Sequence, residues 1–164
     1  MMHVSRRLVV TSLFVTVSVV LGLGWMPAAT AQTVTVDFDN PAPTGWALNG
    51  VFQGIDFGAG QWAWEPAYLV NPTNHIYFAS SVGTTRTFRF ATGPRILRSL
   101  RVFTPRAGTL TLSDDTGQTF TGTVAVGSLQ LVTTGWDRGS TTVSVNFTEG
   151  WALGVDDITY REAF

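Results

Sequence analysis

Hydrophobic and polar residues alternate along short stretches through most of the chain after residue 33. The clearest stretch is 142–147, where valine and phenylalanine alternate with threonine, serine and asparagine. The same period of two recurs at 34–39, 86–90, 100–103 and 109–113. Such alternation is typical of β-strands that bury one face and expose the other. The pattern therefore predicts several short strands, each with one face towards a common core.

Turn residues separate these runs and set their order. Asp114 to Gly117 form a turn after which 120–126 would return beside 109–113, and 153–160 would close the domain. Residues 40–81 are the least regular part and should hold two or three short strands with long loops. After residue 31, no window keeps hydrophobic residues at helical spacing. We therefore predict an all-β fold, an antiparallel β-sandwich.

The first 31 residues have the three parts of a secretory signal peptide. His3, Arg6 and Arg7 give a positive start, 8–25 carry no charge, and Ala29-Thr30-Ala31 is a small-residue cleavage motif. We predict cleavage after Ala31, which leaves one domain over 32–164 and a secreted, extracellular protein. The alternative is a retained N-terminal membrane anchor.

Composition narrows the classes of function. The chain has no cysteine, so disulfides, thiolate metal sites and lipid attachment through cysteine are excluded. All ten basic residues are arginine, and without residues 1–31 eight arginines face eleven acidic residues, a formal net charge of −3. That charge does not favour nucleic acid or an anionic membrane as a partner. A polar, weakly charged surface with several tryptophans suits sugars better than ions.

Three motifs stand in order along the chain: 36–39 (VDFD), 50–57 (GVFQGIDF) and 153–160 (LGVDDITY). Together with the run at 108–112 they resemble the jelly-roll β-sandwich of secreted bacterial carbohydrate-binding modules. The resemblance implies an antiparallel jelly-roll β-sandwich in which the first and last strands pair. It covers nearly all of 34–160.

In many such modules a structural calcium ion is bound, so the resemblance also implies a Ca²⁺ site. Calcium takes six to eight oxygen ligands from carboxylates and carbonyls. Pairing of the first and last strands would bring four carboxylates together as metal ligands: Asp37, Asp39, Asp156 and Asp157. The alternative is that these carboxylates are solvated or cap nearby backbone amides.

Aromatic residues are the candidate ligand contacts, because a sugar stacks its C–H face on an aromatic ring while polar groups bind its hydroxyls. Trp62 and Trp64 lie two residues apart and should share one strand face, with Trp46 and Tyr68 in the same irregular region. The candidate polar contacts are Asn49, Gln53, Glu65, Asn71, Asn74 and Arg89. The alternative is that most of these rings fill the core; we expect this of Trp136 and Trp151.

A further basic stretch contains Arg95, Arg98, Arg101 and Arg106. It could contact an acidic polysaccharide or a phosphate group, or it could be a polar strand face balanced by Asp114, Asp115 and Asp137. The negative charge of the whole domain favours the second interpretation.

No motif indicates catalysis. Asp56 and Glu65 are the acidic residues between 40 and 106, and nothing in the sequence fixes the separation that a glycosidase needs. His75 is the one histidine after residue 31, without a recognisable triad around it. We therefore predict a non-catalytic extracellular domain that binds a polysaccharide or oligosaccharide. The alternatives are a structural or adhesive secreted surface protein with a protein partner, and a small secreted polysaccharide-active enzyme.

Overall fold

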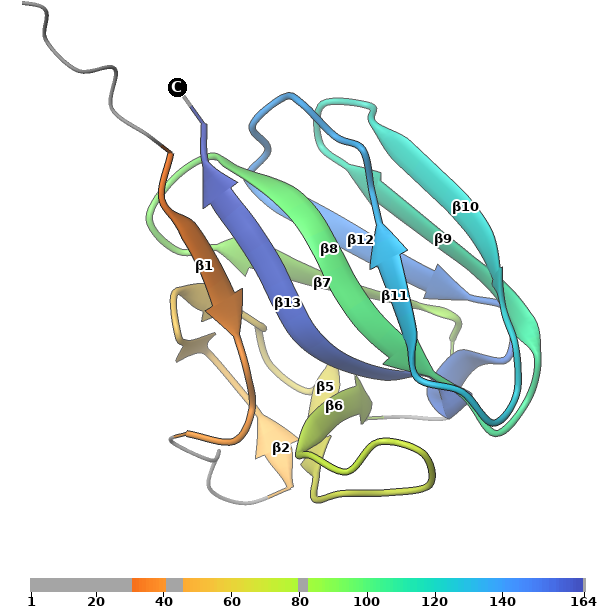
Figure 1. Ribbon diagram of the computed structural model, residues 1–164. Helices are drawn as coiled ribbons and strands as arrows, with labels where there is room; N and C mark the ends of the chain where they lie inside the picture. The colour runs from red at the N-terminus through yellow and green to blue at the C-terminus, as the bar shows by residue number, and fades with distance from the viewer. Residues whose placement is uncertain (1–30, 41–45, 80–82, 164) are drawn as a thin grey trace, which may run out of the picture.

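The computed structural model describes residues 31–40, 46–79 and 83–163, and these form two antiparallel sheets stacked face to face (Figure 1). The predicted all-β sandwich is confirmed. The predicted signal peptide falls almost wholly on residues 1–30, outside the described residues. In the part of the chain that is described, no helix is long and apolar enough to cross a membrane.

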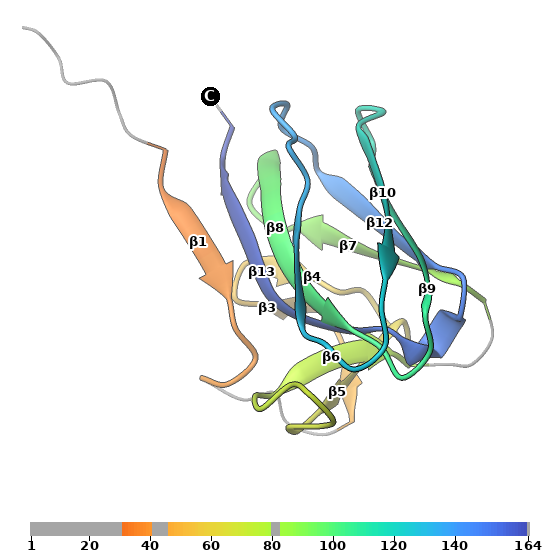
Figure 2. The same cartoon turned by 45° about the vertical axis from the view of Figure 1, so that its right-hand side comes forward.

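The first sheet has seven strands. In spatial order they are β11 (Gln130–Thr133), β8 (Arg95–Phe103), β13 (Gly154–Glu162), β6 (His75–Phe78), β5 (Trp62–Glu65) and β2 (Ala47–Leu48), and β1 (Thr33–Val36) also pairs with β13. The second sheet has six strands. They are, in spatial order, β10 (Thr119–Val124), β9 (Gly108–Asp114), β12 (Thr142–Phe147), β7 (Thr85–Phe90), β4 (Ile55–Asp56) and β3 (Val51–Phe52). Figure 2 shows β1, β13 and β8 in one layer, with β7, β12 and β9 in the other.

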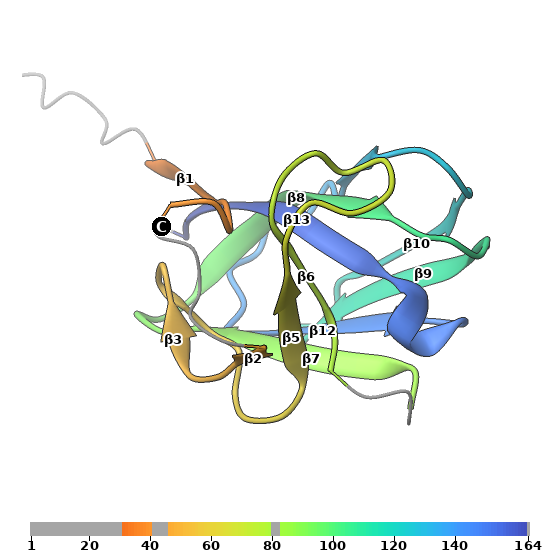
Figure 3. The same ribbon diagram turned by 90° about the horizontal axis from the view of Figure 1, so that it is seen from below.

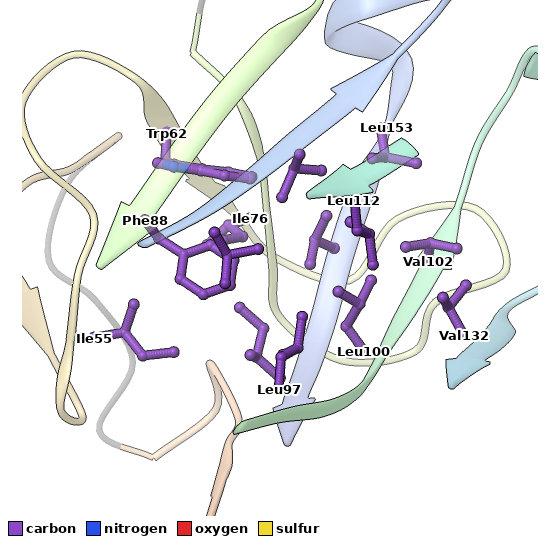
Figure 4. Packing of buried hydrophobic residues seen from close by; sticks show 14 of the residues in the cluster. Ile55, Trp62, Ile76, Phe88, Leu97, Leu100, Val102, Leu112, Val132 and Leu153 are labelled. Atoms are coloured by element: carbon purple, nitrogen blue, oxygen red, sulfur yellow. The ribbon is translucent and has the colours of Figure 1, made fainter. Parts of the chain in front are cut away.

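The core lies between the two sheets and follows the period of two in the sequence. In β12, Val143, Val145 and Phe147 are fully buried, whereas the residues between them are half-buried. Trp62 and Ile76 contribute from the first sheet (Figure 4). This alternation is what separates the inner face of each sheet from its outer face.

The strand β13 has neighbours along both edges. On one edge it pairs with β8, and on the other it pairs first with β6 and then with β1. The predicted pairing of the first and last strands is confirmed, with Val36 opposite Ile158. Between Asp156 and Thr159 the register of β13 against β8 shifts. Asp157, within this irregularity, has a φ of 47°, a conformation that Asp and Asn tolerate better than most residues. Figure 3 shows the long loop after β5 lying next to β8 and β13.

Candidate functional site

A hollow of about 440 Å³ lies on the outer face of the seven-stranded sheet, at the end of β13 that follows the 3₁₀ turn η1 (Gly150–Ala152). Side chains on this face alternate with the core residues of the same strands: Tyr77 lies between the buried Ile76 and Phe78. Four aromatic rings line the hollow: Tyr68, Tyr77, Phe103 and Trp151. Three ionisable side chains join them: Glu65, His75 and Arg106.

Gly154 keeps the floor of the hollow open. It is paired with Tyr77 of β6 on one side and Phe103 of β8 on the other. A Cβ at position 154 would lie 2.3 Å from the ring of Phe103, far inside van der Waals contact. Phe103 in turn meets His75 edge to face, with 4.7 Å between the ring centroids. The floor therefore requires glycine, and the rings pack around it.

His75 and Glu65 form the polar side of the hollow. The Nε2 atom of His75 lies 3.6 Å from Oε2 of Glu65, and His75 is almost fully buried whereas Glu65 is about one-third exposed. Burial lowers the pKa of His75 below its ordinary value, and the nearby Glu65 offsets this in part. The imidazole is therefore neutral at pH 7. Burial and Glu65 also raise the pKa of Tyr77, so its phenol stays protonated and can donate a hydrogen bond.

Arg106 and Trp151 form the opposite wall. The Arg106 guanidinium carbon lies 6.0 Å from the centroid of the Trp151 ring, at the outer limit of a cation–π contact. Trp151 is 46 % exposed, so one part of its indole is open to a ligand. The prediction that Trp151 belongs to the core is wrong: it stands in the turn η1, where strand alternation does not decide which way a side chain points.

Two of the residues singled out as ligand contacts line the hollow, Tyr68 and Glu65. Trp62 does not: it is fully buried, donates from Nε1 to the Thr87 carbonyl oxygen at 2.8 Å, and packs against Phe57 and Phe78. The prediction that Trp62 stacks on a ligand is wrong, because the large side chains of β5 face the core. Trp64 shares that face and packs against the core.

The remaining predicted contacts lie elsewhere. Asn71 is buried and its side-chain amide donates to Asp156, so this amide is not exposed to a ligand. Trp46 is 75 % exposed but does not line the hollow. The side chains of Asn49, Gln53 and Asn74 bond to backbone groups, and Arg89 is on the other sheet, in β7.

The sequence analysis did not identify His75 and Tyr77 as ligand contacts, assigned Trp151 to the core, and favoured a charge-balancing role for Arg106. A signal was present for two of them. In the run 75–78 the period of two places His75 and Tyr77 on one face, opposite the apolar Ile76 and Phe78. The positions of Arg106 and Trp151 depend on the pairing of β8 with β13, which no local pattern reveals.

The four aspartates expected to bind metal lie around the junction of β1, β6 and β13. Asp156 is buried, and its Oδ2 accepts from Asn71 at 3.0 Å and from the Thr73 hydroxyl at 2.7 Å. Asp37 accepts from two backbone amides and Asp39 from one. In the residues that are described, no three or more acidic or histidine side chains are arranged to hold a metal ion. Asp37 and Asp39 therefore cap backbone amides, whereas Asp156 is bonded to side chains of the loop after β5.

The aspartates nevertheless influence one another. Burial raises the pKa of Asp157, the negative charge of Asp156 raises it further, and Arg101 lowers it through an ion pair of 3.1 Å. Asp37 and Asp39 also raise this pKa. The calcium site stays a prediction.

No protein-family model matches the chain, and no curated protein matches it. Solved structures of family 29 carbohydrate-binding modules do match. One such module has 10 % identity over 80 % of this chain and 89 % of its own, with a TM-score of 0.46. Variants in complex with mannohexaose and with cellulohexaose have 11 % and 10 % identity, cover 80 % and 81 % of this chain and 92 % of their own, and both have a TM-score of 0.47. The sheet pairing described above establishes the β-sandwich independently of these matches.

The buried His75 makes stability depend on pH. Because its pKa is lowered in the folded state, the unfolded chain binds the proton more readily, so stability falls as the pH drops below about 6.5, the ordinary histidine value. Between pH 7.5 and 5.5, urea unfolding should show a loss of stability, up to a limit of about 1.4 kcal/mol for one histidine that binds its proton only in the unfolded chain. The His75→Gln variant should lack this dependence. Equal slopes in the two proteins would contradict the assignment.

Calcium removal tests the metal prediction. A ligand that binds only the native state raises stability, so a chelator should lower the Tm and added Ca²⁺ should restore it. Asp39→Asn should lose this response, whereas Asp137→Asn, an exposed site away from the cluster, should keep it. A Tm that the chelator leaves unchanged overturns the prediction.

Proposed function

We propose that this protein is a non-catalytic carbohydrate-binding domain and that the hollow over Gly154 is its binding site. The observation that carries the proposal is the combination of Tyr68, Tyr77 and Trp151 with hydrogen-bonding groups around one open hollow. Aromatic faces can pack against the C–H face of a sugar, and Glu65, Arg106 and the Tyr77 phenol can bond its hydroxyls. The volume falls in the lower part of the range of about 300–1,000 Å³ for ligand sites, which suits a short stretch of sugar units.

The absence of catalysis is part of this proposal. Most glycosidases use two carboxyl groups that flank the bond to be cleaved. Among the residues that line the hollow, Glu65 is the one carboxylate. Asp56, the other candidate acid, lies in β4 of the opposite sheet. This arrangement supports binding rather than hydrolysis.

The proposed partner is an extracellular polysaccharide or oligosaccharide. The support for the location is the signal-peptide pattern of residues 1–31, with its positive start, uncharged stretch and small-residue exit.

A second candidate function has its own observation. A hollow of about 430 Å³ beside the first is lined by Leu69, Val70 and Val126, and all three are exposed. Exposed apolar side chains that cluster favour contact with another protein, as expected of a structural or adhesive surface protein. Concentration-dependent light scattering separates this candidate, since carbohydrate binding alone requires no self-association.

Variants of residues that line the hollow test the carbohydrate proposal. Binding is measured on a glycan array and then by calorimetry with the best ligand found. Trp151→Ala should weaken binding about five- to thirtyfold, because a lost aromatic contact of this kind costs about 1–2 kcal/mol. Tyr68→Ala should weaken it in the same direction. Trp46→Ala is the matched control, since Trp46 is also exposed but does not line the hollow, and it should bind like the unaltered protein.

Two outcomes contradict the proposal. If no glycan binds, the function is wrong. If Trp46→Ala loses binding while Trp151→Ala keeps it, a glycan binds at a different place and the site is wrong.

A further inference from the structure

In the basic stretch of the sequence, Arg95, Arg98 and Arg101 bond to other groups of the protein, whereas Arg106 lines the hollow. Arg95 pairs with Glu162 at 3.5 Å and Arg101 pairs with Asp157 at 3.1 Å. Arg98 donates to the carbonyl oxygen of Trp136 at 3.2 Å. Arg106 lies on the wall of the hollow over Trp151, and among the described residues no carboxylate lies within ion-pair distance of it.

The sequence analysis expects Asp114, Asp115 and Asp137 to balance the charge of these arginines. Asp114 and Asp115 instead accept hydrogen bonds from Thr116, Gln118 and Thr141 in and near the β9–β10 turn. Their carboxylates therefore serve local turns. They do not balance Arg106.

The carboxylate within the hollow is at the opposite end from Arg106. Glu65 is in β5, and Arg106 follows β8; β6 and β13 lie between these strands. Three strand spacings amount to about 14 Å. Glu65 also has His75 as its neighbour. The hollow is therefore positive at one end and negative at the other.

A guanidinium in this position is suited to a carboxylate. Arginine presents paired N–H donors that match the two oxygens of a carboxylate, and packing over an aromatic ring limits the conformations of its side chain. The protein as a whole carries a negative formal charge, so general attraction does not draw anions to it. Binding of an acidic sugar must come from a local contact such as Arg106.

We propose that the hollow takes a uronic-acid residue of an acidic polysaccharide, with Arg106 binding the sugar carboxylate. The inference rests on the proposed carbohydrate-binding function and names its substrate class. The sugar ring packs against Trp151, and the neighbouring sugar units extend along the hollow past Tyr77 towards Glu65. Because Glu65 repels a second negative charge, the carboxylate binds at the Arg106 end, which fixes the orientation of the sugar.

Matched pairs of ligands test this inference. The probes are oligomers of galacturonic, glucuronic, mannuronic and guluronic acid, each compared by calorimetry with its carboxyl-reduced neutral counterpart. At least one acidic oligomer should bind about tenfold more tightly than its neutral counterpart, because the hydrogen bonds between Arg106 and the sugar carboxylate are charged and therefore stronger than those to the neutral hydroxyl. The preference should weaken as salt is raised.

Variants assign the preference to a residue. Arg106→Gln should bind both members of the pair equally. Arg89→Gln removes the same charge from an exposed site on the other sheet, and it should keep the preference. Equal binding of acidic and neutral oligomers by the unaltered protein, or a preference that survives in Arg106→Gln, overturns the inference and leaves the proposed function standing. No binding to any acidic or neutral oligomer overturns the proposed function itself.

Discussion

The buried carboxylate of Asp156 holds together the part of the molecule on which the site depends. It lies on the outer face of β13, at the point where the edge of that strand passes from β6 to β1. A buried charge is costly unless hydrogen bonds satisfy it. Asn71, Thr73 and the backbone amide of Asp157 supply those bonds. Two of these donors belong to the loop after β5, so the carboxylate ties this loop to β13.

The consequence for the hollow is direct. Asn71 and Tyr68 exchange two backbone hydrogen bonds of 3.0 Å, so the loop that Asp156 holds also carries Tyr68. Two residues before Asp156 on the same face of β13 is Gly154, the floor of the hollow. The spacing of two along β13 thus places the structural anchor and the binding surface side by side. One set of hydrogen bonds therefore fixes a wall of the hollow relative to its floor.

The sequence predicts the sandwich well because the burial of strands has a local period. The alternation in 142–147 is enough to assign both the strand β12 and its inner face. The same reasoning places Trp62 and Trp64 on one face of β5 but does not say which face. Their partners in the neighbouring strand β6, Phe78 and Ile76, are buried, and this pairing puts the two tryptophans on the core face. Arg106 and Trp151 meet only because β8 and β13 pair across more than forty residues of chain, which a local pattern cannot reveal.

The central claim is that the outer face of the first sheet, at Trp151, binds carbohydrate. The indole N–H signals of the five tryptophans after residue 31 can be followed by NMR while an oligosaccharide is added. We predict that the Trp151 signal shifts and saturates, whereas the signals of the buried Trp62 and of the exposed Trp46 stay in place. A saturating shift at Trp46 with no change at Trp151 would contradict the claim.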